Sequence, residues 1–234
     1  TQRDYIAGEV SKDLSKRILL PEKVVYDEDG NLLDEKCFLA KYGLRTADAS
    51  HPEYNKHFNH ECLWNGPSWP YATSIALTAL YEALQGPDAA SLPVDSGDFA
   101  KLLHQYAAQQ TLVHPDGRKV PWIDENLHPF TGEWQARRIM IEQDRLGIKK
   151  MLYRERGKDY NHSTFCDLVI AGLCGIVPQE DGKLCVKPLA PKEWDWWCID
   201  GVRYHGRDIT VLFDRDGTRY GKGKGLVVIG EDEK

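Results

Sequence analysis

The stretch W-N-G-P-S-W-P, from Trp64 to Pro70, stands directly before a run that is rich in Ala and Leu and carries little charge, Ala72 to Leu84. Apolar side chains recur in that run at helical spacing, at Ile75, Leu77, Ala79, Leu80 and Leu84. A helix with so few polar positions is expected to be buried on most sides. The stretch therefore predicts a rigid aromatic corner that opens a buried helix.

Similar patterns on either side of this helix predict a mainly α chain. Further helices are expected at residues 1–20, from Phe99 to about Thr111, from Trp134 to about Leu146 and from Ser163 to about Cys174, with Asn161 or Ser163 as N-cap of the last. Residues 23–59 read as a long connection with a D-E-D-G-N turn, and H-P-D-G forms another turn. Apolar helices that alternate with polar, aromatic-rich loops suit a helical barrel whose loops gather at one end.

The character of the sequence changes from Ile176 onward. The segments D-G-K-L-C-V-K-P, W-W-C-I-D-G-V-R-Y-H-G and D-I-T-V-L-F-D-R-D-G are short, alternating and broken by Gly and Asp, as in β-hairpins. We therefore predict a helical portion over residues 1–177 and a small antiparallel β module over residues 178–234.

Composition excludes several functional classes. The chain has 234 residues, is 41% hydrophobic and 28% charged, and carries a net charge of −6 without a long basic run, which disfavours nucleic acid as a partner. The apolar runs are too short for a membrane span. The six cysteines lack zinc-like spacing, so we expect no metal site and mostly free structural thiols, with Cys166 and Cys174 inside a helix; a disulfide among the others stays open. No glycine-rich phosphate loop, G-x-S-x-G or H-E-x-x-H motif is present, and we expect no cofactor.

Two loops have the composition of a sugar site. In the first, Trp64, Asn65, Gly66 and Trp69 combine indole rings with an amide, which suits a ligand that is apolar on its face and polar at its edge. The alternative is a core corner before a helix.

The second loop, W-I-D-E-N-L-H-P-F-T-G-E-W, carries Asp124, Glu125 and Asn126 in a row, beginning two residues after Trp122. A solvated turn would explain the acids, whereas the flanking indole favours a carboxyl group with a tuned pKa. Glycoside hydrolysis needs two carboxyl groups, and neighbours in an extended loop point apart, so a second group must come from elsewhere.

A third polar loop, D-Y-N-H-S, offers Tyr160, Asn161 and His162 at a helix start. His162 is either a proton shuttle or a residue that positions a hydroxyl or caps the helix. Asp167 lies within the following apolar pattern, where a charge needs a partner.

The order of these motifs resembles the C-terminal part of inverting glycoside hydrolases with an (α/α)6 barrel. The similarity is to family 63 and the mannosylglycerate-hydrolase-like group, and more distantly to the family 37 trehalases. It rests on Y-G-L-R-T (Tyr42 to Thr46), W-N-G-P-S-W (Trp64 to Trp69), E-N-L-H-P-F-T-G (Glu125 to Gly132) and D-Y-N-H-S-T-F. Leu127 departs from the aromatic residue usual after the base, which leaves the sugar preference open.

This resemblance implies part of an (α/α)6 toroid followed by a β module, with Glu125 as the general base. The sugar contacts it implies are Trp64, Asn65, Gly66, Trp69, Trp122, Asp124, Asn126, Tyr160, Asn161 and His162. The substrate would be an α-glycoside such as an α-glucoside or α-mannoside.

The resemblance also implies that the chain is incomplete by itself. A full barrel needs about twelve helices of roughly 10 to 14 residues, about twice the helical residues available. The general acid of these families is an aspartate upstream of all the motifs above. We therefore expect a C-terminal fragment whose open apolar edge is covered by the upstream polypeptide or by another copy of the chain. The alternatives are a carbohydrate-binding protein or pseudoenzyme, and a structural domain in which Trp64 and Trp122 are fully buried.

Overall fold

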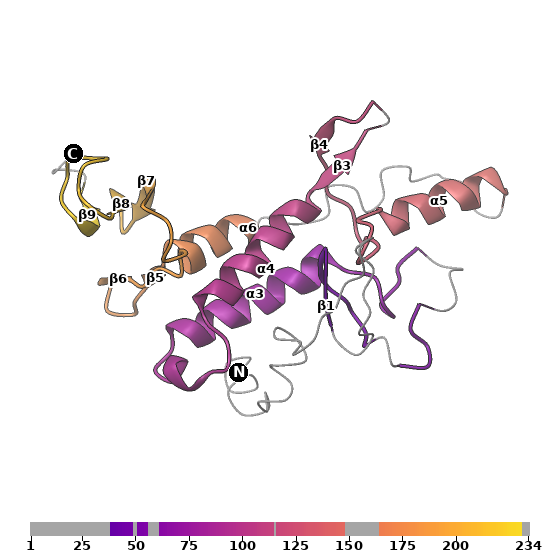
Figure 1. Ribbon diagram of the computed structural model, residues 1–234, viewed down its shortest axis with the longest axis horizontal. Helices are drawn as coiled ribbons and strands as arrows, with labels where there is room; N and C mark the ends of the chain where they lie inside the picture. The colour runs from indigo at the N-terminus through magenta and orange to yellow at the C-terminus, as the bar shows by residue number, and fades with distance from the viewer. Residues whose placement is uncertain (1–37, 49–50, 56–60, 115, 148–163, 231–234) are drawn as a thin grey trace. The chain divides into compact units, whose positions relative to one another are not determined.

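A computed structural model describes residues 38–48, 51–55, 61–114, 116–147 and 164–230 (Figure 1). The chain divides between Phe165 and Cys166 into two compact units, and each has its own fold. The helix predicted at residues 1–20, the D-E-D-G-N turn and the predicted N-caps Asn161 and Ser163 lie outside the described residues.

The first unit is built on a helical hairpin of α3 (Pro70–Gln85) and α4 (Ser96–Gln109), joined through the short 3-10 helix η1 (Ala89–Ser91) (Figure 1). Pro70 begins α3, where a missing N–H and a fixed φ suit the first helical position. At α4, Asp95 and Asp98 form a reciprocal capping box. Both helices confirm the sequence prediction within a few residues.

The expectation that the helix now labelled α3 is buried on most sides is wrong for the described part of the chain. Its inner face is buried at Leu77 and Leu80, but Tyr71 and Ile75 are 40% and 39% exposed. These two residues are four apart and so share one face of the helix. The elements that pack on α3, which include α4, β2 and η1, leave this face open.

A small hairpin that the sequence did not predict packs on these helices. Its strands are β1 (Leu39–Ala40) and β2 (Gly43–Leu44). Two glutamines of α4 hold it: Gln105 donates to the carbonyl of Ala40 at 3.2 Å, and Gln109 donates to that of Tyr42 at 2.6 Å. The hairpin thereby fixes the Y-G-L-R-T motif beside the helices.

The described part of the first unit also contains a second hairpin and the helix α5. Strands β3 (Thr111–Val113) and β4 (Lys119–Pro121) flank the predicted H-P-D-G turn. The loop that carries Asp124, Glu125 and Asn126 follows β4, and α5 (Gln135–Arg145) follows the loop. This helix confirms the one predicted from Trp134 to about Leu146, and it buries Ile139 and Met140.

The last predicted helix has a different form. A short α-helix, α6 (Thr164–Asp167), continues as a π-helix, η2 (Leu168–Leu173), whose wider turn is closed by the Cys174 N–H donating to the carbonyl of Val169 at 2.8 Å. Cys166 lies in this helix, as expected, but is exposed, and Asp167, for which the apolar pattern predicted a partner, is also exposed to solvent. Apolar periodicity does not distinguish a π-helix from an α-helix over two turns.

The second unit then forms two antiparallel sheets, as the hairpin patterns predict. One pairs β5 (Ile176–Pro178) with β6 (Leu184–Val186), and the other has the order β7 (Trp196–Tyr204), β8 (Arg207–Asp214) and β9 (Gly225–Ile229). In β7 and β8, Trp197 is opposite Phe213 and Ile199 is opposite Val211, so their apolar side chains share one face. The glycine-rich R-Y-G-K-G-K-G run lies in the connection from β8 to β9.

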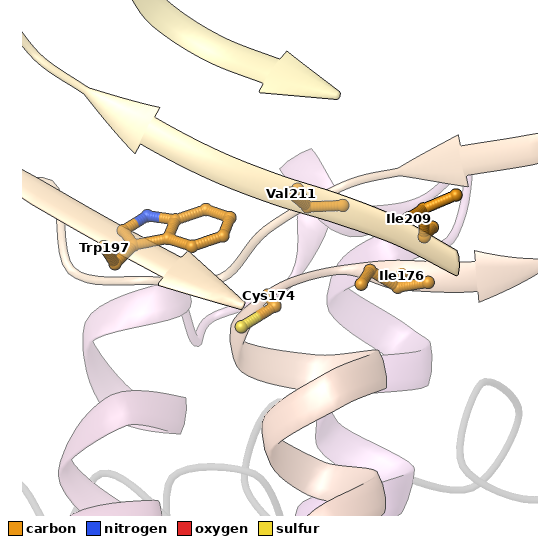
Figure 2. Packing of buried hydrophobic residues seen from close by; sticks show 5 residues of the cluster. All are labelled: Cys174, Ile176, Trp197, Ile209 and Val211. Carbon is orange, nitrogen blue, oxygen red and sulfur yellow. The ribbon is translucent and has the colours of Figure 1, made fainter. Parts of the chain in front are cut away.

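This face packs on the end of the π-helix (Figure 2). The core of the unit comprises Cys174, Ile176, Trp197, Ile209 and Val211. Gly175 allows the backbone after the π-helix to lie close to the backbone at Lys187, just after β6. Its φ is +72°, and an added Cβ would lie 2.0 Å from the carbonyl carbon of Lys187. Burial raises the pKa of Cys174 to about 11, so this thiol is protonated at neutral pH.

No cysteine in the described part of the chain forms a disulfide; the thiols there are Cys62, Cys166, Cys174, Cys185 and Cys198. None of the helices in the described ranges has the length and apolar character needed to cross a membrane. The described residues thus form a mainly helical first unit and a second unit built of small antiparallel sheets.

Candidate active site

Backbone hydrogen bonds bring three of the four sequence motifs together. Ser68 lies between Arg45 and Leu127 and forms an antiparallel bridge with each. The bridge to Leu127 is reciprocal, with two N–H···O bonds of 2.9 Å. The Y-G-L-R-T, W-N-G-P-S-W and E-N-L segments, far apart in sequence, are therefore side by side.

Within the third segment, burial alternates from residue to residue. Asp124 and Asn126 are 0% exposed, whereas Glu125 between them is half-buried, with its Oε2 atom shielded from solvent. The side chain of Asn126 donates to the carbonyl of Glu61 at 3.0 Å. The sequence predicts Asp124 and Asn126 as sugar contacts, but in this arrangement neither side chain reaches the surface.

Asp124 forms a buried ion pair with α5. Its Oδ2 accepts from Nε of Arg137 at 2.8 Å, and the side chain of Arg137 is only 15% exposed. Its Oδ1 accepts from the N–H of Glu125 at 3.0 Å. A buried carboxylate requires such partners, because desolvation without them is costly.

The aromatic corner consists of one exposed and one buried indole. Trp64 stacks on Trp69 with ring centroids 4.1 Å apart and an interplanar angle of 19°. Trp69 is 1% exposed, and its Nε1 donates to the carbonyl of Leu63 at 2.6 Å. Trp64 is 48% exposed. The fixed inner ring therefore supports an outer ring that is available to a ligand.

The loop between the two tryptophans is tightly constrained. The Asn65 side chain donates from Nδ2 to the backbone carbonyl of Glu53 at 3.0 Å. The backbone carbonyl of Asn65 accepts from the backbone N–H of Asn55 at 2.7 Å. Gly66 has a φ of +151°, and an added Cβ would lie 2.7 Å from the side chain of Asn55. Only glycine fits both the backbone conformation and the space at this position.

Arg45 packs against Tyr54 and against Phe130 of the turn that follows Glu125, a role that the sequence did not reveal. Its side chain is 3% exposed, and its guanidinium lies over the rings of Tyr54 and Phe130 at 5.5 and 5.6 Å from their centroids. Such a contact combines cation–π attraction with burial of the flat guanidinium faces. Arg45 stands in the Y-G-L-R-T motif, so the motif itself was the available signal.

His128 organises the turn that follows Glu125. Its Nδ1 accepts from the N–H groups of Phe130 and Thr131 at 3.3 and 3.1 Å, which requires the unprotonated nitrogen. Burial lowers the pKa of His128; Glu133 opposes this shift and Arg138 adds to it. At neutral pH the imidazole is therefore neutral and the H-P-F-T turn is held.

The remaining predicted residues are placed as follows. Trp122 is half-buried, and its backbone N–H donates to the backbone carbonyl of Gln110 at 3.1 Å. With Trp64 exposed and Trp122 only half-buried, the full burial expected of a structural domain is not observed. Tyr160, Asn161 and His162 lie outside the described residues. In the described ranges no group of three or more His, Cys, Asp and Glu residues could hold a metal ion.

The buried polar residues behind the loops carry no recognisable signal in the sequence. Glu61 is 1% exposed, and Arg137 holds Asp124. The sequence offers no signal that separates Arg137 from its neighbour Arg138, which is exposed and pairs with Glu133 at 3.2 Å. Only the position of Asp124 against α5 distinguishes them.

Comparison with known proteins identifies the family. Residues 19–163, more than half of the chain, match the model of the mannosylglycerate hydrolase MGH1-like glycoside hydrolase domain. The chain belongs to this family. The range includes all three bridged segments, so the described site lies within the MGH1-like domain. Residues 178–229 match the C-terminal domain of glycosyl hydrolase family 65, and this range includes strands β6 to β9 of the second unit.

A solved structure is similar to most of this chain. A protein named "Sialidase" is 36% identical to this chain with a TM-score of 0.67, over 85% of this chain. The chain spans 16% of the length of that protein. This chain therefore resembles one part of a much longer protein.

Proposed function

We propose that this MGH1-like domain supplies the general base and part of the sugar site of an inverting glycoside hydrolase that acts on α-glycosides such as α-glucosides or α-mannosides. The observation that supports this most is the position of Glu125. It is half-buried between two fully buried residues, and its loop is hydrogen-bonded to the aromatic corner through Ser68 and Leu127.

In this proposal Glu125 removes a proton from a water molecule. The water oxygen attacks the anomeric carbon, the glycosidic C–O bond breaks, and the leaving oxygen receives a proton from an aspartate outside this chain. The two carboxyl groups would stand about 6.5–9.5 Å apart, which leaves room for the water. Partial burial of Glu125 favours a carboxylate that keeps one water oriented rather than one that is fully hydrated.

The exposed ring of Trp64 would stack on the apolar face of a sugar. Its stacking partner Trp69 keeps the ring from rotating, so little rotamer entropy is lost on binding. Tyr160, Asn161 and His162 would complete the sugar site, together with Asn65 and Trp122.

The decisive test is Glu125→Gln with α-glucosyl and α-mannosyl fluorides. Fluoride leaves with little proton donation, so these compounds report on the base even where the acid is missing. We expect Glu125→Gln to lower turnover by about 100-fold or more while sugar binding is retained. Glu133→Gln is the matched control, since Glu133 is an exposed glutamate of the same loop that pairs with Arg138. Fluoride release and proton NMR of the first-formed anomer are the measurements, on this chain and on the longer polypeptide that the proposal requires.

Two outcomes would redirect the proposal. Equal turnover by the wild type and Glu125→Gln would remove Glu125 from the role of base. Sugar binding without turnover by the longer polypeptide would favour a carbohydrate-binding protein or pseudoenzyme. An α-sialoside belongs in the panel because the similar solved structure is named "Sialidase".

A further inference from the structure

We propose that Asp124 is a positioning residue for Glu125 rather than a sugar contact, and that the first turn of α5 holds the base loop on both sides of Glu125. This inference rests on the proposed function, because it takes Glu125 as the base.

The partners of Asp124 leave it little capacity for a ligand. It is 0% exposed, its Oδ2 accepts from Arg137 at 2.8 Å and its Oδ1 accepts from the Glu125 N–H at 3.0 Å. A sugar hydroxyl would reach this carboxylate only after the loop had moved and the ion pair had lost its partner, which is costly for a buried charge.

The residue on the other side of Glu125 is held by the same helix. The N–H of Gln135, the first residue of α5, donates to the carbonyl of Asn126 at 3.0 Å. Arg137 lies two positions further along and holds Asp124. The residues before and after Glu125 are therefore both tied to residues 135–137.

This arrangement determines where the Glu125 side chain points. Two anchors that flank one residue fix its Cα position and the direction of its Cα–Cβ bond, while the side chain itself remains half-buried. A general base must lie within hydrogen-bond reach of the attacking water, and a displacement of about 1 Å can cost roughly 100-fold in rate. The ion pair thus acts on the rate through geometry and not through contact with the substrate.

The test compares Asp124→Asn and Arg137→Met with Arg138→Met, the matched control on the adjacent exposed residue. The measurements are kcat and KM for the glycosyl fluoride that the wild type hydrolyses best, together with thermal unfolding. We expect kcat to fall about 10- to 100-fold in the first two variants, with KM changed by less than about threefold. Arg137→Lys, which keeps the charge, should recover part of the loss, and Arg138→Met should match the wild type.

Several results would overturn the inference. A raised KM with unchanged kcat in Asp124→Asn would show that Asp124 binds the sugar. Unchanged kcat in folded Asp124→Asn and Arg137→Met would show that the ion pair does not position the base. If Asp124→Asn does not fold, equal kcat values in Arg137→Met and Arg137→Lys would show that the ion pair does not position Glu125. The proposed function fails in a distinguishable way, by turnover that survives Glu125→Gln or by no turnover in the wild type, and this inference then fails with it.

Discussion

At the scale of the residue, His128 links local structure to pH. The neutral imidazole accepts two backbone N–H groups, and burial lowers its pKa below that of the unfolded chain, which is about 6.5. The unfolded state therefore binds a proton first. The contribution of His128 to the free energy of unfolding is fully present above pH ~6.5 and is lost as the pH falls through the lower pKa of the folded state.

We expect His128→Asn to remove this loss, because the Asn Oδ1 can accept the same two N–H groups but does not titrate. The measurement is the free energy of unfolding in urea between pH 7 and pH 5, with His104→Asn, an exposed position on α4, as control. The assignment would be wrong if His128→Asn lost stability with pH as steeply as the wild type and the control.

At the scale of the element, the capping box makes the start of α4 a defined boundary. The Asp95 carboxylate accepts from the N–H groups of Gly97 and Asp98 at 2.7 and 3.2 Å, and the Asp95 N–H donates to the Asp98 side chain. Asp95→Ala should cost about 1 kcal/mol in the free energy of unfolding of the first unit, since it leaves helix N–H groups without acceptors. Asp88→Ala is the control, because Asp88 precedes η1 without a capping hydrogen bond from its side chain. Similar losses in the two variants would argue against the cap as the cause.

At the scale of the whole molecule, the two compact units have separate cores, and we expect them to unfold separately. Trp197 is 8% exposed in the core of the second unit, so Trp197→Ala should destabilise that unit by about 3–5 kcal/mol. Native-state hydrogen exchange should show the loss of protection in β8 while α4 keeps its own. Trp194→Ala, at a 43% exposed site nearby, should change protection little. Equal loss in α4 and β8 would mean that the two units unfold as one.

Much of the element content followed from local sequence. Apolar spacing predicted α3 and α4 to within a few residues, and the structure shows that Pro70 and the Asp95 cap, which act locally, set where each helix begins. The β5–β6 and β7–β8 hairpins follow from alternation and turn glycines. The β1–β2 hairpin could not be predicted, because strands of two residues show no periodicity. The side chains that hold it, Gln105 and Gln109, are 65 and 67 positions away in the sequence from the carbonyls they bind.

For the candidate site, the sequence alone determined which loops carry aromatic, amide and carboxyl groups, and the motif order indicated the family that residues 19–163 match. Only the tertiary structure decided which of those side chains are accessible. Trp64 and Trp69 are equivalent in sequence, as are Asp124 and Glu125, yet one of each pair is buried and the other is not. The reason is physical: exposure depends on what packs from distant segments, here Ser68 against Leu127 and Arg137 against Asp124, and such contacts leave no local pattern in the chain.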